Sequence, residues 1–197
     1  MMVIVGGITR LTESGLSMVD YNLFIGAIPP LNHADWVEAF NQYKQYPEYQ
    51  KQNFLFTLSE FKTIFFWEYI HRVLGRFVGL VFIIPFIYFL IKKRLSKGLI
   101  IECTILFFMG AMQGAIGWWM VKSGLVNNPD VSHFRLATHL ITAFLTFSYT
   151  FWVALKLIYP DKIHFKTKLY KLSSVLMIFV VIQIIYGAFV AGLDGGN

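Results

Sequence analysis

Four stretches of about 20 or more mostly apolar residues recur along this chain, at 64–91, 99–121, 132–159 and 172–192. An α-helix rises 1.5 Å per residue, so each stretch is long enough to cross the roughly 30 Å hydrocarbon core of a bilayer. Hydrophobic residues make up 56% of the 197 residues and charged residues only 14%, which is not the balance of a water-soluble domain. The sequence therefore predicts an all-α integral membrane protein, a transmembrane helical bundle.

Residues 1–11 are also apolar but are long enough for only about half a span. They have the pattern of the outer end of a first helix whose beginning is missing. At the other end, the sequence stops directly after the last apolar stretch. We therefore expect a chain that is shortened at both ends relative to longer relatives.

The net charge of +6 does not indicate a nucleic-acid partner, because the basic residues cluster between apolar stretches instead of covering a soluble face. They are Lys92, Lys93, Arg94 and Lys97 in one loop, and Lys156, Lys162, Lys166, Lys168 and Lys171 in the other. Basic loops face the cytoplasm or the matrix. Residues 12–63 and 122–131 are then external, and the single cysteine, Cys103, cannot form a disulfide within the chain.

The external segment 12–63 carries Trp36, Phe40 and Tyr43 at helical spacing. This pattern predicts a short amphipathic helix on the membrane surface. It is interpreted as a cap over the bundle, with a docking place for a substrate or partner as the alternative.

Glycines recur at three similar segments, VGGITRLTESGL, QGAIGWWMVKSGL and YGAFVAGLDGG, each at the end of an apolar stretch. The similarity suggests duplicated helix pairs. Because glycine lets helices approach closely in lipid, we expect helix packing at the pairs Gly75 with Gly79 and Gly110 with Gly114.

Ionisable side chains inside a membrane span usually face the bundle interior and mark a functional site. Glu68 and His71 lie three residues apart, on one helical face, and His139 lies in another span. Each histidine is about 7 residues, or roughly 10 Å, from the predicted start of its span. Two imidazoles at one depth can hold a metal between facing helices. The alternative is that each is a hydrogen-bonded packing residue.

A haem fits this pair better than zinc or copper, because a haem needs only two axial ligands and the walls of the spans are rich in phenylalanine. Its propionates need cations, and the candidate partners near the outer ends of the spans are Arg10, Arg72, Arg76 and Arg135. Each arginine has snorkelling to the interface as an alternative role. Glu68 is a candidate proton-handling group near the iron, or else a counter-ion of Arg72 or Arg135.

Five segments of the chain resemble the haem A synthase family, membrane enzymes that convert haem O into haem A for cytochrome oxidase. They are GGITRLTESGLSMVDYNLFIGAIPPL, PEYQKQNFLFTLSEFKTIFFWEYIHRVLGRFVGL, QGAIGWWMVKSGL, VSHFRLATHL and GAFVAGLDGGN. They follow the family's order, cover essentially the whole chain, and are similar to its mitochondrial and alphaproteobacterial branch. The external cysteine pair of another bacterial branch has no counterpart in this sequence.

The resemblance implies an eight-helix protein made of two related four-helix bundles. Residues 1–159 would form the amino-terminal haem-binding bundle, with an incomplete first helix. Residues 160–197 would form an inner loop and the first helix of an incomplete second bundle. The family's second histidine pair, which binds haem b in the second bundle, has no position in this sequence.

The family's E-x-x-H motif corresponds to Glu68 and His71, and its partner histidine to His139. The resemblance thus implies that the two histidines are axial ligands of the substrate haem O and that Glu68 is catalytic. A ring methyl of haem O would be oxidised in successive hydroxylations to a gem-diol, which loses water to become the formyl group of haem A. We therefore expect a haem-oxidising oxidoreductase.

Three alternatives remain open at this point: a bis-histidine membrane cytochrome that only carries electrons, an inactive truncated remnant or half-protein, and a proton-coupled transporter. The expected partners are haem O, membrane lipid, an electron donor and the haem O synthase, with a homo-oligomer also compatible with the sequence. The expected location is the bacterial plasma membrane or the mitochondrial inner membrane.

Overall fold

The computed structural model describes residues 1–19, 28–126, 129–159 and 168–193, and these residues form helices and no strand. In chain order the helices are α1 (Met2–Leu11), α2 (His33–Tyr43), α3 (Pro47–Lys51), α4 (Leu58–Ile91), α5 (Lys97–Gly124), α6 (His133–Ile158) and α7 (Lys168–Gly192). The predicted all-α fold is confirmed.

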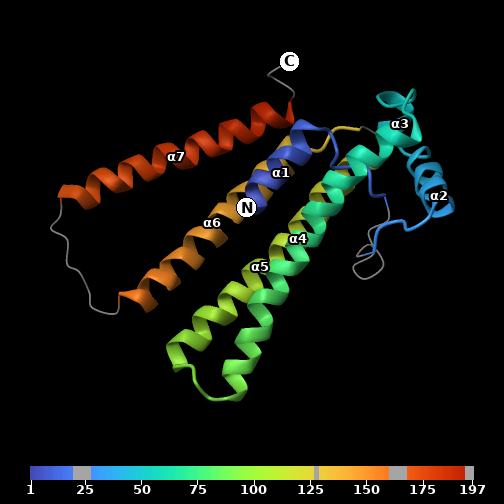
Figure 1. Ribbon diagram of the computed structural model, residues 1–197. Coiled ribbons are helices and arrows are strands. Elements are labelled where there is room, and N and C mark those ends of the chain that lie inside the picture. The colour runs from blue at the N-terminus through green and yellow to red at the C-terminus, as the bar shows by residue number, and fades with distance from the viewer. Residues whose placement is uncertain (20–27, 127–128, 160–167, 194–197) are drawn as a thin grey trace.

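Four of these helices, α4, α5, α6 and residues Leu169–Gly192 of α7, are long and apolar enough to cross a membrane, while α1 is a shorter apolar helix. They correspond to the four predicted spans. In Figure 1, α4 and α5 lie side by side as a hairpin, α6 follows α5, and α7 packs on α6. Helix α1 packs against α4. The chain is thus a helical integral membrane protein.

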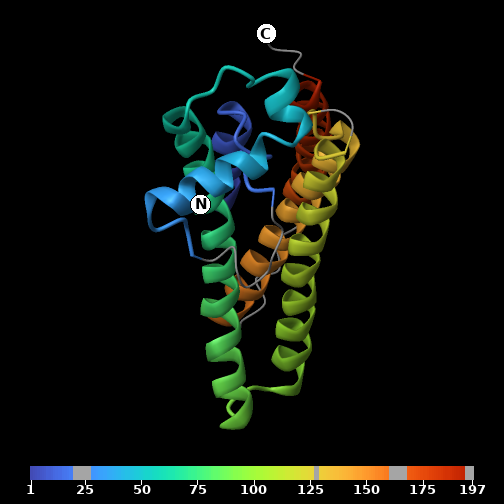
Figure 2. The ribbon, with the colours of Figure 1, turned by 90° about the vertical axis from the view of Figure 1, so that its right-hand side faces the viewer.

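Both ribbon views place α2, α3 and the start of α4 at one end of the molecule, together with the end of α5 and the start of α6 (Figures 1 and 2). The short connection between α4 and α5 lies at the opposite end. This arrangement agrees with placing residues 12–63 and 122–131 on one side of the membrane. Of the basic residues predicted in the loops, Lys162 and Lys166 lie outside the described residues.

Helix α4 begins at Leu58, six residues before the predicted start of its span. Thr57 caps it: its side chain accepts a hydrogen bond from the backbone N–H of Glu60, and the Glu60 side chain accepts one from the backbone N–H of Thr57. This reciprocal capping box satisfies backbone groups that the first turn leaves without helical partners. The first two turns of α4 therefore extend beyond the apolar stretch that the sequence indicates.

Those extra turns are covered by α2, whose apolar face packs on them as the amphipathic pattern predicted. The ring of Trp36 lies edge-on to Phe65 with 5.1 Å between centroids, and the rings of Phe40 and Tyr43 each lie 5.1 Å from that of Phe61. Phe61 is completely buried in this cluster. The cap over the first turns of α4 is thus a packed aromatic core.

The glycine pairs of the long helices do not make the close contacts that were predicted for them. A Cβ added at Gly79, Gly110 or Gly114 would meet nothing within 4 Å in the described part of the chain, and one at Gly75 would meet only the end of the Met2 side chain. These glycines lie on open stretches of the helices. Other glycines do have a neighbouring segment close by, and two of them, Gly6 and Gly117, lie next to the predicted histidine ligands.

Candidate functional site

Glu68 is buried in α4, with only 4% of the residue exposed. Its Oε2 accepts a hydrogen bond of 2.7 Å from the Ser17 hydroxyl and one of 2.8 Å from the backbone N–H of Met18. Both donors come from the segment that follows α1. A buried carboxylate is stable only when hydrogen-bond donors replace the water it has lost. The contact between this segment and α4 supplies two such donors to Glu68.

The turn at the end of α1 explains how the segment reaches Glu68. Glu13 adopts a left-handed backbone conformation, with φ at 50°, and the N–H of Ser14 donates to the carbonyl of Thr9. A left-handed residue after a helix is a common way to end it and turn the chain. The turn directs Ser17 and Met18, both buried, across the face of α4.

Arg72 completes the environment of Glu68 from the next turn of α4. Its guanidinium donates to Glu68 Oε1 at 2.5 Å and to the carbonyl of Met18 at 2.9 Å. Of the two arginines considered as counter-ions, Arg72 is therefore the one that pairs with Glu68. The proton-handling role of Glu68 stays a prediction.

The two histidines predicted as ligands each lie beside a glycine of a neighbouring helix. A Cβ built on Gly6 of α1 would lie 3.3 Å from Nε2 of His71, and one on Gly117 of α5 would lie 3.2 Å from Cε1 of His139. Both histidines are partly buried. The imidazoles of His71 and His139 come from different helices, α4 and α6, and lie near enough for their charges to influence each other. The fold thus brings the predicted pair together.

The predicted propionate partners lie on α1, α4 and α6. Arg135 in α6 donates to the Trp119 carbonyl at 2.7 Å and lies over the Trp119 ring, 4.5 Å from its centroid. Arg76 follows Arg72 by one turn of α4 and is partly buried. Arg10 donates to the Ala191 carbonyl near the end of α7. Three of the four arginines therefore lie on the two histidine-bearing helices, whereas the contact described for Arg10 fastens α1 to α7.

The donors present are compatible with a haem. Nδ1 of His139 is buried and has no hydrogen-bond partner within the part of the chain that the structure describes. The described residues contain no group of three histidine, cysteine, aspartate or glutamate side chains that could hold a metal ion. Two imidazoles from separate helices are enough for the axial positions of a haem iron, whereas zinc sites usually need at least three protein ligands. The residues thus fit a haem held between His71 and His139.

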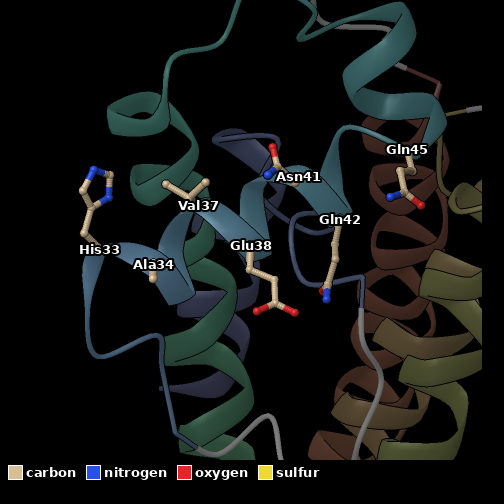
Figure 3. Close-up of a pocket in the computed structure, with 7 residues that line it drawn as sticks. All are labelled: His33, Ala34, Val37, Glu38, Asn41, Gln42 and Gln45. Atoms are coloured by element: carbon tan, nitrogen blue, oxygen red, sulfur yellow. The ribbon is translucent and has the colours of Figure 1, made fainter.

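A shallow surface hollow on α2 is not part of this arrangement. Figure 3 shows it lined by side chains of α2, His33, Glu38 and Gln42 among them, and by Gln45 just after the helix. It lies on the polar face of the cap, and His33 is exposed there. Because most of its side chains are exposed and all belong to the cap, substitutions here serve as controls for substitutions in the site.

Several residues of the site were not identified from the sequence. Ser17 and Met18 hold Glu68 from 51 and 50 residues away, and no local spacing indicates such a contact. Gly6 and Gly117 do fall in two of the similar glycine-containing segments, VGGITRL and QGAIGWW. The similarity of these segments is the one sequence feature that points to Gly6 and Gly117.

Comparison with known proteins gives a family match over residues 1–197, to the COX15-CtaA family, described as cytochrome oxidase assembly protein. The chain is 58% identical over 197 residues to the "Heme A synthase" of Flavobacterium psychrophilum, covering 99% of this chain and 58% of that protein. It is 55% identical over 199 residues to that of Flavobacterium johnsoniae, covering 100% and 58%.

A third relative, the "Heme A synthase" of Nitrosospira multiformis, is 49% identical over 199 residues, covering 99% of this chain and 56% of that protein. The chain therefore spans a little over half the length of these curated relatives. No solved structure matches the chain.

Proposed function

The chain belongs to the cytochrome oxidase assembly protein family, and from this premise we propose that it carries the substrate site of a haem A synthase. In this proposal the substrate haem O lies between His71 and His139, and one of its ring methyls is oxidised by successive hydroxylations to a formyl group. The relatives named "Heme A synthase" support the proposal. The product, haem A, serves cytochrome oxidase.

The observation that carries the proposal is the pair of imidazoles. They come from different membrane-spanning helices, lie near enough for their charges to interact, and each packs closely against a glycine of a neighbouring helix. The iron of the bound substrate supplies the redox chemistry. The two histidines would hold the haem at one place between α4 and α6, which limits how the substrate can be positioned.

Glu68 and Arg72 are proposed to act at the rim of the same macrocycle. Glu68 lies one helical turn before His71, so its side chain is on the same face of α4. Its hydrogen bonds with Ser17, Met18 and Arg72 hold the carboxylate in one orientation. A fixed carboxylate can orient a reacting group or hold a proton during oxidation of the methyl.

The arginines Arg72, Arg76 and Arg135 are proposed to pair with the propionates, because guanidinium groups bind carboxylates with two parallel hydrogen bonds. Arg10 stays a weaker proposal, since its described contact is with the end of α7. The haem site belongs to the unit of residues 1–159, and haem b to a second bundle, as the family resemblance implies.

For the membrane setting, we propose that residues 12–63 face the external side, because the described basic residues Lys92, Lys93 and Lys97 lie at the other end of the helices. A bacterial plasma membrane is the proposed location, with the mitochondrial inner membrane as the alternative. The proposed partners are an electron donor and the enzyme that supplies haem O.

The experiment is to express the full chain in a host that supplies haem O, purify it, and identify the bound porphyrins by chromatography and mass spectrometry. We expect haem O with haem A or a hydroxylated precursor. His71→Ala and His139→Ala should each lose most of the bound haem, whereas His33→Ala, on the exposed face of α2, should keep it. Glu68→Gln should keep haem O and lose the oxidised products. Haem retained by both ligand variants would refute the proposal.

A further inference from the structure

The backbone beside each proposed axial histidine is close to the imidazole ring. A Cβ on Gly6 would meet only two atoms within 4 Å in the described chain, Nε2 of His71 at 3.3 Å and Cδ2 of His71 at 3.7 Å. The three atoms nearest to a Cβ on Gly117 are all in the His139 ring, with Cε1 at 3.2 Å and Nε2 at 3.7 Å. In both places an imidazole occupies the space that a side chain would need.

Other close glycines in the molecule face different groups. A Cβ on Gly124 would meet the Leu16 side chain at 2.8 Å, and one on Gly192 would meet the Cβ and Cα of His133 at 2.6 and 2.8 Å. Those contacts are ordinary close packing between segments of the chain. Gly6 and Gly117 differ because what they accommodate is the part of a histidine that carries a metal-binding nitrogen.

We propose that Gly6 and Gly117 are positioning residues of the haem site. The absence of a side chain at each position lets the imidazole edge of His71 or His139 lie against the neighbouring helix, in the ring orientation with which the two histidines would hold a haem. This inference rests on the proposed haem site and adds two residues to it, one on α1 and one on α5. The haem-binding pair therefore depends on four helices, with α1 supporting α4 and α5 supporting α6.

The physical reason lies in the small tolerance of metal ligation. Carbon atoms in contact prefer separations of about 3.5–4.0 Å, so a methyl at 3.2 or 3.3 Å would displace the ring by a few tenths of an ångström. Metal–ligand distances tolerate only about 0.2 Å. An added methyl at Gly6 crowds Nε2 itself, whereas one at Gly117 crowds the carbon between the two nitrogens. We expect Gly6→Ala to weaken ligation directly and Gly117→Ala to rotate the ring.

The chain offers a matched control for each substitution. Gly7 is the next residue of α1, Gly114 lies one turn from Gly117 on α5, and a Cβ at either would meet nothing within 4 Å among the described residues. Replacing glycine with alanine in a helix interior stabilises the helix through its intrinsic propensity. This gain in helix stability is the same in the test variant and in its control. Any difference between Gly6→Ala and Gly7→Ala, or between Gly117→Ala and Gly114→Ala, reports on the histidine contact.

The test is to titrate each purified full-length variant with haem b, following the Soret band, and to record the electron paramagnetic resonance spectrum of the ferric complex. Gly6→Ala should bind haem b about tenfold more weakly than Gly7→Ala, with a larger high-spin fraction, as expected for an overpacked site. Gly117→Ala should stay low-spin with shifted g values, whereas Gly114→Ala should match wild type.

Two results would overturn the inference in distinguishable ways. If both test variants match their controls while His71→Ala and His139→Ala lose haem, the haem site stands and the positioning role fails. If wild type binds haem b without using these histidines, the proposed function fails and this inference fails with it.

A double substitution covers the case in which Gly6→Ala does not fold. With His71→Ala in the same chain, the ring that the new methyl would displace is gone. Folded yield and thermal stability of the double variant should then equal those of Gly7→Ala with His71→Ala. A double variant that stays unfolded would show that Gly6 serves helix packing, and the inference would be wrong.

Discussion

A buried carboxyl in the cap over α4 gives the most quantitative prediction. Glu48 of α3 is only 4% exposed, and its Oε2 has no hydrogen-bond partner among the described residues. Tyr43, fully buried, shares a hydrogen bond with this carboxyl and accepts another of 2.8 Å from the Asn53 amide. Such a carboxyl is more stable in its neutral form, because an ionised one would be desolvated without sufficient compensation.

Burial raises the pKa of Glu48 from 4.5 to about 8, and the charges of Glu68 and Glu13 add to the rise, while the hydrogen bond with Tyr43 opposes it. Burial also raises the pKa of Tyr43, so that hydroxyl stays neutral over the same range. The folded cap therefore holds a proton between pH 4.5 and 8 that the unfolded cap releases. The stabilisation of the cap by protonated Glu48 is complete below pH 4.5. It falls as the pH rises to about 8, and the stability of the cap no longer changes through this group above that pH.

One proton changes the free energy of opening by about 1.4 kcal/mol per pH unit, or roughly 5 kcal/mol over the whole range as an upper value. We expect the equilibrium constant for opening of α2 and α3 to rise by up to about tenfold per pH unit between pH 5 and 8. Hydrogen–deuterium exchange of peptides from residues 33–53, corrected for the intrinsic exchange rate, measures this constant.

Glu48→Gln replaces the carboxyl with a neutral amide of the same shape, so its opening should lose this dependence on pH. Glu38→Gln is the matched control, because Glu38 lies on the exposed face of α2 (Figure 3). It should keep the wild-type slope. An unchanged slope in Glu48→Gln would refute the reasoning.

Further predictions concern the contacts around Glu68, each measured as the change in thermal stability of the purified protein. Ser17→Ala removes a hydrogen bond to the buried carboxylate and should cost about 1.5–3 kcal/mol; no loss would mean that the bond contributes nothing. Arg72→Met leaves Glu68 buried without its ion-pair partner and should cost about 3–5 kcal/mol, whereas Arg72→Met with Glu68→Leu should recover most of that loss. Gly124→Ala should cost about 1–3 kcal/mol through its contact with Leu16, and Leu16→Ala in the same chain should reduce that cost.

Much of the fold could be predicted from the sequence because bilayer thickness fixes the length of an apolar span. The four spans follow from this length, whereas α2 follows from the helical spacing of its aromatic residues. The start of α4 was placed six residues too late, because residues 58–63 read as polar loop. Their helical state depends on the Thr57 capping box and on burial of Phe61 under α2, and the latter is a tertiary contact.

The early start of α4 changes how deep each histidine lies from the start of its helix. His71 is the fourteenth residue of α4, counted from Leu58, and His139 is the seventh of α6, counted from His133. Counting from the helix starts therefore does not give equal depths. The equal depth of the two histidines stays a prediction, which counts from the start of each apolar stretch and not from the first helical residue.

The surroundings of the site could be predicted only in part. The E-x-x-H spacing indicates that Glu68 and His71 share a face, since that follows from helical periodicity. The hydrogen bonds from Ser17 and Met18, and the contacts of Gly6 and Gly117 with the histidines, join helices or segments far apart in sequence. Only three-dimensional packing could identify these residues.

The central claim is that His71 and His139 together hold one haem. Its most direct test is near-infrared magnetic circular dichroism of the ferric haem-loaded full chain, because the charge-transfer band there identifies the axial ligands. We predict a bis-imidazole signature in wild type and in His33→Ala, and its loss in both His71→Ala and His139→Ala. A bis-imidazole signature that survives either of these two substitutions would contradict the account.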